Sequence, residues 1–411
     1  MSQVELKIDH VGARGDGIAK TDKRSIFVPF ALAGEIATVD VVKSRGVITE
    51  LKSKSPDRID PACKHFQKCG GCVAQHMSDE AYQNWKLDHA QQVLDKSGIK
   101  HKIDLFKSCA PGERRRVVLT AERSNEETKI GYLQAGTHDL VSITECPVAH
   151  PKIVEHLDLF CEIAQIITPH YKSSQLTILL CENGFDIAVE ADFSLKDATI
   201  HAVSQKATST KTIKRLAFNG EVLVEIEPTV LTFGDTLIQV PSGSFVQASK
   251  RAELEVVALV TKHLKPCKKI VDLFSGSGTF TFPLAQKSAV HAVETSGAAL
   301  NSIDRGFRSR QGLKPISTER RDLFRSPFVR EDLKPYQGVI FDPPRAGAEA
   351  QSKQLARALN IKKVVAVSCN PTSLARDLEL LVKGGFKIKS ITAIDQFLWS
   401  THVEMVALLE R

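Results

Sequence analysis

The feature that most constrains the fold is a regular alternation of strand-like and helix-like segments through residues 251–411. Short apolar runs such as KKIVDLF, AVHAVE, YQGVIFD and KKVVAVSC alternate with amphipathic segments such as GAALNSIDRGFRSRQ and QSKQLARALN. This alternation is typical of a doubly wound α/β sheet, in which helices connect parallel strands. The last two runs, KIKSITAIDQF and THVEMVALLER, predict a final antiparallel hairpin.

Three further regions precede this α/β domain, so we expect a multidomain α/β protein. Residues 1–55 contain the closely spaced runs SIFV, IATVDVV and VITEL, which predict a small β-barrel of the OB or a related kind. Residues 56–75 form a cysteine-rich loop. Residues 76–250 predict a mixed domain rich in antiparallel sheet, with a helix from the N-cap Ser78 to about Lys96 and a hairpin at Asn183-Gly184.

Composition limits the class of protein. The chain has 411 residues, of which 42% are apolar and 25% are charged, as in folded proteins. We find no run of about 20 apolar residues that would cross a bilayer and no signal peptide, so we expect a cytoplasmic location without a membrane partner.

Net charge is +5 over residues 1–120, −7 over 121–250 and +9 over 251–411. Basic ends are consistent with a polyanionic partner or with ordinary solvated surfaces.

A glycine-rich turn, VDLFSGSGTF at 271–280, follows a strand and opens a helix. Gly276 and Gly278 allow a ligand to approach the backbone at the helix N-terminus. Thr281 replaces the third glycine of a dinucleotide fingerprint, and no Gly-Lys-Ser/Thr follows, which excludes a phosphate-binding P-loop. Glu294 ends the next strand, where it can accept hydrogen bonds from a ribose. The pattern favours S-adenosylmethionine over NAD; a purely structural turn is the alternative.

Two further strands end in chemically distinctive loops. Asp342 begins FDPPRAGA, in which Arg345 could reach a phosphate or a base, and Cys369 lies in VSCNP ahead of a helix whose dipole is expected to stabilise a thiolate. A lone cysteine is otherwise an inert buried residue.

One reaction that would use a cysteine at this edge of the sheet is methylation of uracil C5. That reaction needs a thiolate that adds to C6, a methyl donor and a base. Glu404 is a candidate base. Strand alternation does not distinguish a buried from an exposed position for it, and the sequence alone slightly favours the exposed one.

The cysteine-rich loop reads PACKHFQKCGGC and spaces Cys63, Cys69 and Cys72 as C-x₅-C-x₂-C. Grouped thiols in a reducing compartment indicate a metal site. A structural metal site needs four protein ligands, however, and these cysteines supply only three. The fourth ligand could be Cys109, Cys146 or His65. Spacing alone leaves structural zinc and an iron–sulfur cluster equally open.

Together these motifs resemble the RNA 5-methyluridine methyltransferases, closest to the bacterial 23S ribosomal RNA (uracil-5-)-methyltransferases. The resemblance extends in order through a TRAM-like start with GDGIAK, CKHFQKCGGC, RRR at 114–116, PSGSFVQ, DLFSGSGTF, FDPPRAGA, SCNPTSLARDL and HVEMV. Residues 120–235 match only weakly. Ser249 departs from the family's usual asparagine in FxQxN, and Thr279 from the asparagine of some members.

The resemblance implies the chemistry and the partners. It implies a [4Fe–4S] cluster on Cys63, Cys69, Cys72 and Cys146, with Cys369 as nucleophile and Glu404 as general base. The positions expected to contact the cofactor or uracil are Gln247, Phe274, Gly276, Gly278, Thr279, Glu294, Asp322 and Asp342.

A monomer acting on 23S ribosomal RNA is expected, because the transfer-RNA members usually lack the TRAM and cysteine segments. The barrel, a basic crevice and Arg114, Arg115 and Arg116 are expected to hold phosphates around a flipped uridine. Alternatives are a transfer-RNA uridine methyltransferase, a nitrogen methyltransferase, and a non-catalytic RNA-binding iron–sulfur protein.

Overall fold

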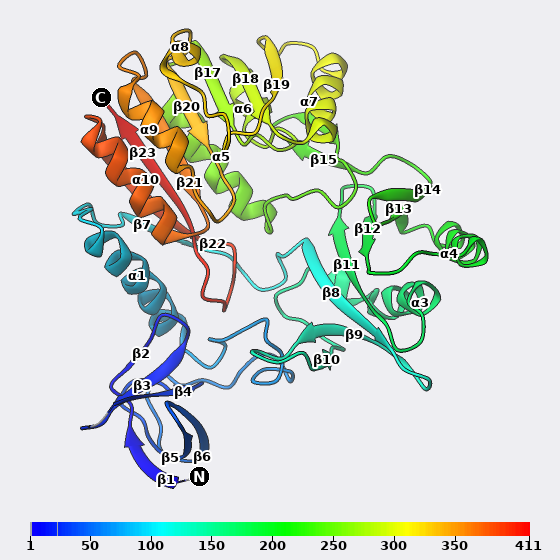
Figure 1. Ribbon diagram of the computed structural model, residues 1–411, viewed down its shortest axis with the longest axis vertical. Helices are drawn as coiled ribbons and strands as arrows, with labels where there is room; N and C mark the ends of the chain where they lie inside the picture. Colours follow the sequence, from blue (N-terminus) through cyan, green and yellow to red (C-terminus); the bar gives the residue numbers. More distant parts are fainter. Residues whose placement is uncertain (1, 23) are drawn as a thin grey trace.

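The computed structural model describes residues 2–22 and 24–411, which form three folded parts (Figure 1). The N-terminal part is a curled six-stranded sheet of order β1-β5-β6-β4-β3-β2. Alternate residues such as Ala37, Val39 and Val41 point inward and bury its small core, as period-two alternation predicts. The strands are β1 (Ser2–Lys7), β2 (His10–Val11), β3 (Asp16–Lys20), β4 (Ser25–Pro29), β5 (Ile36–Val42) and β6 (Arg45–Ser53).

The central domain is a seven-stranded sheet of order β10-β9-β8-β11-β12-β13-β14. Only β12 and β13 of these strands pair in parallel. The hairpin expected at Asn183-Gly184 joins β11 to β12. The elements are β8 (Arg116–Arg123), β9 (Thr128–Leu133), β10 (Leu140–Ser142), α2 (Pro151–Val154), α3 (Leu157–Ile167), β11 (Ser173–Leu180), β12 (Phe185–Glu190), α4 (Asp197–Ser209), β13 (Ile213–Phe218) and β14 (Glu221–Glu225).

The C-terminal domain contains an eight-stranded sheet of order β19-β18-β17-β20-β21-β23-β22-β7. Its elements are α1 (Asp79–Lys96), β7 (Leu105–Ser108), the hairpin β15 (Val230–Phe233) and β16 (Thr236–Gln239), α5 (Lys250–Leu264), β17 (Lys269–Leu273), α6 (Thr281–Ala285), β18 (Ala289–Glu294), α7 (Gly297–Ser309), β19 (Ile316–Arg320), α8 (Arg330–Leu333), β20 (Gly338–Phe341), α9 (Glu349–Arg357), β21 (Lys363–Ser368), α10 (Pro371–Lys383), β22 (Lys387–Asp395) and β23 (Glu404–Glu410).

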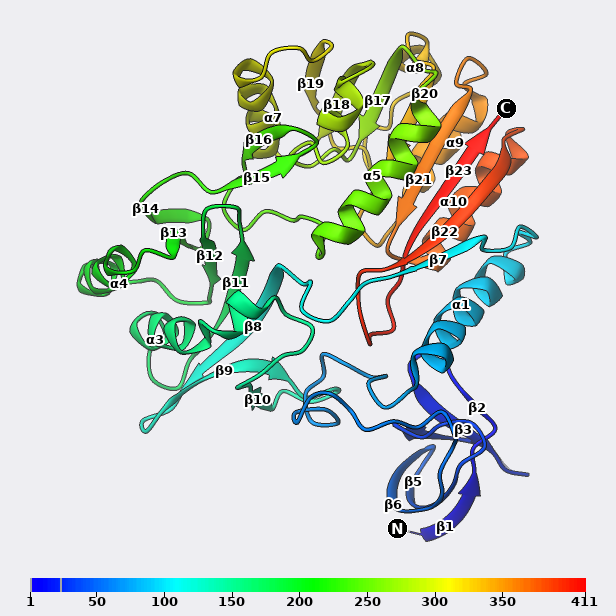
Figure 2. The same ribbon diagram turned by 180° about the vertical axis from the view of Figure 1, so that it is seen from behind.

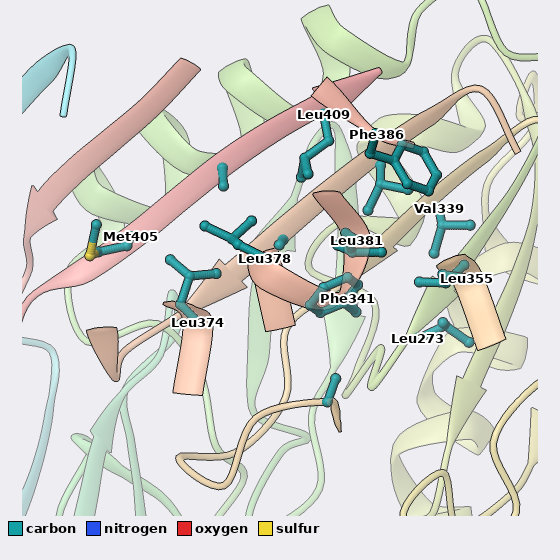
Figure 3. Close-up of a cluster of buried hydrophobic side chains, with 14 of the residues drawn as sticks. Leu273, Val339, Phe341, Leu355, Leu374, Leu378, Leu381, Phe386, Met405 and Leu409 are labelled. Atoms are coloured by element: carbon teal, nitrogen blue, oxygen red, sulfur yellow. The ribbon is translucent and has the colours of Figure 1, made fainter. Parts of the chain in front are cut away.

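Helices cover both faces of this sheet, as expected for a doubly wound fold. Figure 3 shows Phe341 and Val339 of β20 packed with Leu378 and Leu381 of α10 on one face. On the other face, Ile340 packs in a separate cluster with residues of α5, which lies across the sheet in Figure 2. Because successive side chains of a strand point to opposite faces, a strand buried on both sides reads as a continuous apolar run.

The structure differs from the expected boundary at residue 76. The helix with N-cap Ser78 is α1, but it packs against α10 of the C-terminal domain, where Ala90 and Leu94 join the main apolar core. β7 pairs in parallel with β22 at the edge of the C-terminal sheet. The sequence pattern missed this assignment because a parallel partner can lie anywhere along the chain.

Within residues 2–22 and 24–411, no helix combines the length and the apolar character needed to span a bilayer.

Candidate active site

The candidate site lies where four parallel strands end. β17 leads into the glycine-rich turn, β18 ends at Glu294, and β20 and β21 are followed by Asp342 and Cys369. Because β18, β17, β20 and β21 are parallel neighbours, their carboxyl ends meet along one edge of the sheet. Open α/β sheets bind their ligands at this edge.

The glycine-rich turn has the backbone geometry that its sequence predicts. Gly276 has φ of 53°, and its N–H donates to Oε2 of Glu294 over 3.1 Å. At Gly278, with φ of 96°, an added Cβ would lie 2.8 Å from the ring of Phe282. Phe274 adopts φ of 61°, which is costly for a non-glycine residue and is found mainly at functional sites. Its ring lies 5.5 Å from that of Phe324.

Three carboxyl groups surround this turn. Burial, together with the neighbouring Asp342 and Glu294, raises the pKa of Asp272 to about 7. Oδ2 of Asp272 accepts a 2.6 Å hydrogen bond from Thr281, whereas its buried Oδ1 has no partner among the described residues. Burial also raises the pKa of Asp342 to about 7. Such acids favour a positively charged ligand. Asp272 was missed by the sequence analysis, although it lies within the quoted motif.

The remaining expected cofactor contacts lie at the rim of this edge. Thr279 is half-buried within the turn. Asp322 follows β19, and its Oδ1 accepts hydrogen bonds from the backbone N–H groups of Phe324 (3.0 Å) and Arg325 (3.3 Å). Asp322 is thus held in the loop that carries the Phe324 ring toward Phe274.

Cys369 lies between β21 and α10. Burial, together with Glu404 and Asp342, raises the pKa of its thiol to about 11, while Arg345 lowers it. Burial and these acids thus oppose the thiolate that the helix dipole is expected to stabilise. The α10 N-terminus is capped by Asn370, whose Oδ1 accepts from the N–H of Thr372 over 3.1 Å.

Glu404 is 3% exposed, so the interpretation of an exposed position is wrong. It begins β23, which lies between β21 and β22 and is buried on both faces. Burial and the nearby Asp342 raise the pKa of Glu404 well above its ordinary value. Oε1 of Glu404 is buried and has no hydrogen-bond partner among residues 2–22 and 24–411.

Two glutamine side chains connect the acids of the site. Nε2 of Gln247 donates to Oδ2 of Asp342 over 3.0 Å. Nε2 of Gln396 donates to Oε2 of Glu404 over 2.5 Å and to Oε1 of Gln247 over 2.7 Å. Gln396 follows β22 in a loop without a recognisable motif, so sequence reasoning gave no signal for it. Ser249, at the position where the family usually has asparagine, caps α5.

The three consecutive arginines do not form an open phosphate-binding row as expected. Arg115 is buried and its Nη2 contacts Oε2 of Glu253 over 2.5 Å, so it is committed to a structural ion pair. Arg116 lies half-buried, with its guanidinium 6.0 Å from the ring of Phe245. Phe245 is 74% exposed and precedes Gln247 by two residues. An exposed aromatic ring beside a guanidinium is a suitable platform for stacking a base.

The four cysteines expected to bind a cluster line one cavity of about 280 Å³. Its other wall includes Phe397, Leu398, Ser400 and His402 from the loop between β22 and β23, together with Arg345. Cys109, an alternative fourth ligand, is buried instead in the core beside α5. His65 lines the cavity, and its Nε2 accepts from the N–H of Thr144 over 3.1 Å.

Burial, together with the three neighbouring thiols, raises the pKa of the Cys72 thiol to about 12. Among the described residues, no group of three or more His, Cys, Asp and Glu side chains converges closely enough to hold a single metal ion. Four thiols around one cavity nevertheless form a donor set that suits iron–sulfur chemistry.

A glycine turn, carboxyl groups and a thiol at one edge of this α/β sheet define a methyltransferase-type domain, and comparisons with known proteins agree. The family model "tRNA (Uracil-5-)-methyltransferase" matches residues 214–411, and the TRAM domain model matches residues 2–46. An RNA methyltransferase of Brucella suis is 43% identical over 407 residues, which cover 99% of this chain and 98% of that protein. The chain belongs to the RNA (uracil-5-)-methyltransferase family.

Two more distant relatives carry more specific names. A 23S rRNA (uracil(1939)-C(5))-methyltransferase of Yersinia enterocolitica is 29% identical, with 96% of this chain and 92% of that protein covered. The crystal structure of a Pyrococcus abyssi tRNA (uracil-54, C5)-methyltransferase with S-adenosyl-L-homocysteine superimposes with a TM-score of 0.76 at 22% identity, covering 98% and 99% of the two chains. This likeness confirms the predicted fold of an N-terminal TRAM domain, a sheet-rich centre and a C-terminal methyltransferase domain.

Proposed function

We propose that this RNA uracil methyltransferase methylates C5 of a specific uridine in 23S ribosomal RNA, with S-adenosylmethionine as donor. The observation that carries the proposal is the grouping of a thiol, Cys369, with two buried carboxyls, Asp342 and Glu404, at the sheet edge that bears the glycine-rich turn. A nitrogen methyltransferase would not need this thiol.

The residues of the turn fit the proposed donor. S-adenosylmethionine carries a sulfonium and an ammonium group, which Asp272, Glu294 and Asp342 would favour electrostatically. Glu294 lies at the end of β18, where its carboxylate can face a ribose, and Gly276 leaves open space beside it. When bound, the donor supplies an electrophilic methyl group. Phe274, Gly278, Thr279 and Asp322 are proposed to complete this site.

Cys369 and Glu404 are proposed to act in sequence on the uracil ring. After the thiol of Cys369 gives up its proton to solvent, the sulfur forms a bond to C6, and the electron pair of the C5–C6 double bond moves toward O4, which makes C5 nucleophilic. C5 would then take the methyl group with the electron pair returned from O4, as the bond between that methyl and the sulfur of the donor breaks to leave S-adenosylhomocysteine. Glu404 accepts the C5 proton, the electron pair of that C–H bond re-forms the double bond, and the C6–sulfur bond breaks to release the thiolate.

Ribosomal RNA as the substrate is supported by the name of the Yersinia relative, which matches 96% of this chain. The target uridine must be unpaired or flipped to reach Cys369. Gln247 and Asp342 are proposed to contact the flipped base from the opposite side of the crevice, and Phe245 to stack on a neighbouring base.

A [4Fe–4S] cluster on Cys63, Cys69, Cys72 and Cys146 is a further part of the proposal. What supports it is the cavity that these four thiols share, although Cys146 lies 74 positions after Cys72 in the chain. A single zinc ion needs all its thiolates within about 2.3 Å of one point, whereas a cluster binds each thiolate at a separate iron atom. The donor set therefore suits a cluster better than one ion.

The test of the proposed reaction uses 23S RNA fragments carrying 5-fluorouridine. With S-adenosylmethionine present, we expect a covalent protein–RNA complex that survives denaturation, because fluorine at C5 cannot leave as a cation. Cys369→Ala should form none. Normal turnover by Cys369→Ala would contradict the mechanism, and methylation of transfer RNA in place of ribosomal RNA would contradict the substrate.

A further inference from the structure

We infer that Gln396 is a positioning residue for the general base, holding Glu404 by one carboxyl oxygen and joining it to Gln247 and Asp342. The inference rests on the proposed function. Gln396 does not touch the reacting atoms; it acts through Glu404. The resulting row of side chains, Glu404–Gln396–Gln247–Asp342, runs from β23 to the end of β20.

The terminal hairpin brings Gln396 to Glu404. Ile394 of β22 pairs with Glu404 of β23. Gln396 lies two residues beyond Ile394 and therefore occupies the diagonal position, from which a long side chain can reach across the pair. Gln396 is 4% exposed, so its amide must satisfy its hydrogen bonds within the protein.

A backbone group determines which way the Gln396 amide faces. Oε1 of Gln396 accepts a 3.1 Å hydrogen bond from the N–H of Ala248. A backbone N–H can only donate, so the amide oxygen must face Ala248 and the NH₂ group must face Glu404 and Gln247. One hydrogen then goes to Oε2 of Glu404 and the other to Oε1 of Gln247.

The orientation passes on to Gln247. Because Oε1 of Gln247 accepts from Gln396, its own NH₂ group must face Asp342, to which it donates over 3.0 Å. Among the described residues, the second hydrogen of this NH₂ group has no acceptor. A single N–H of Ala248 thus sets the polarity of both amides.

The arrangement leaves one oxygen of Glu404 for chemistry. Oε2 is held by Gln396, whereas Oε1 is buried without a partner among the described residues. We assign Oε1 as the atom that receives the C5 proton. Hydrogen-bond donation by Gln396 favours the ionised carboxylate that a base requires, against burial and the charge of Asp342, which oppose it.

The groups facing Glu404 from neighbouring elements are Asp342 after β20 and Cys369 after β21, with Arg345 acting on the thiol. His402 lies on the same loop and its Nε2 is 3.0 Å from Nη2 of Arg345. Among the described residues, Asp342, Cys369, Arg345 and His402 make no hydrogen bond to Oε2 of Glu404. The donor to this oxygen is Gln396.

The decisive variant is Gln396→Met, which keeps the side-chain length and removes both donors and the acceptor. We expect C5 proton removal to slow by about 10- to 100-fold, the loss typical of one hydrogen bond to a charged group. The methylated covalent intermediate should then accumulate with ordinary uridine RNA, and the rate should recover as pH rises. Affinity for S-adenosylmethionine should not change.

A buried glutamine elsewhere provides the matched control. Gln351 on α9 is also buried, but its amide contacts only the backbone of Phe328, at 2.8 and 3.0 Å. Gln351→Met should lower the unfolding temperature without accumulating the intermediate. If Gln396→Met does not fold, Gln396→Asn keeps an amide that is too short to reach Glu404 and should give the same intermediate.

The outcomes separate this inference from the reaction on which it rests. If Glu404→Gln accumulates the methylated intermediate while Gln396→Met and Gln396→Asn turn over like the natural enzyme, the positioning role is wrong and the proposed function stands. If Gln396→Met and Gln351→Met lose activity in proportion to stability alone, Gln396 is merely structural. If Glu404→Gln and the natural enzyme form no covalent species at all, the proposed function itself fails.

Discussion

Lys86 of α1 and Asp395 at the end of β22 form an ion pair buried in the protein interior, although 309 positions separate them in the chain. Nζ of Lys86 also donates to the carbonyl oxygens of Phe397 (3.0 Å) and His402 (2.7 Å), and Tyr82 donates to Asp395 over 2.7 Å. α1 therefore fixes both ends of the loop that separates Gln396 from Glu404.

Removing one partner of this pair should destabilise the protein strongly. Lys86→Met leaves the carboxylate of Asp395 buried without its counter-ion, and we expect a loss of about 3–5 kcal/mol in the free energy of unfolding of the C-terminal domain. Thermal unfolding checks this. Lys353→Met, which breaks an exposed pair with Glu349, is the control and should change stability by less than about 1 kcal/mol.

Donor binding should depend on Glu294. Its two oxygens accept backbone N–H groups from Gly276, Thr295 and Ser296, so the carboxylate shapes the turn as well as facing the proposed ribose. We expect Glu294→Ala to weaken binding of S-adenosylmethionine by about 1.5–3 kcal/mol, measured by calorimetry. Glu319→Ala on the neighbouring strand β19 is the control. Equal affinity in both variants would remove Glu294 from the donor site.

Phe245 should contribute to RNA affinity without contributing to donor affinity. Stacking on an exposed aromatic ring is worth about 1–3 kcal/mol per base, so Phe245→Ala should weaken RNA binding roughly 5- to 150-fold. Leu237, on the β15–β16 hairpin, is also exposed, and Leu237→Ala should bind RNA normally. Fluorescence anisotropy with a labelled RNA fragment measures both, and similar affinities for the two variants would contradict the assignment.

Stability should depend on pH through Asp272. Its pKa is raised to about 7, far above the ordinary value of 3.8, so the folded chain holds this proton more tightly than the unfolded chain. The resulting stabilisation is complete below about pH 4 and is lost as pH rises toward 7, at up to about 1.4 kcal/mol per pH unit. Asp272→Asn should therefore gain stability relative to the natural protein as pH rises from 4 to 7. A constant difference across this range would contradict the prediction.

Iron content should identify the ligand set of the cysteine cavity. Anaerobically prepared protein should contain about four irons per chain, and Cys146→Ser should lower that content. Cys109→Ser is the control, because Cys109 lies in the core beside α5 and does not line the cavity. Stoichiometric zinc without iron or sulfide would contradict the cluster.

The alternation of strands and helices in the C-terminal domain follows from its sequence because buried parallel strands, caps and glycines leave local signals. Ser78, Ser249 and Asn370 each cap a helix through a side-chain oxygen. The glycine-rich turn and Asp342 likewise follow strands whose apolar runs are unmistakable. These signals lie within ten residues of the feature that they predict, so no tertiary information is needed to interpret them.

Features set by distant contacts could not be predicted in this way. The burial of Glu404 depends on β22 and β21 lying on either side of β23, and the raised pKa of Cys369 depends on carboxyls from two other segments. The sequence predicted Arg115 to be a phosphate ligand, because its ion-pair partner Glu253 lies on the distant helix α5. Gln396 acquires its place from a backbone N–H almost 150 residues earlier.

The pairing of β7 with β22 has a consequence for biosynthesis. β7 leaves the ribosome long before β22. The two strands can pair only after the central domain and nearly all of the α/β domain have been made. Contacts so distant along the chain close slowly. We expect the TRAM and central domains to acquire structure on the nascent chain, whereas the eight-stranded sheet can form fully only after β22 and β23 have been made.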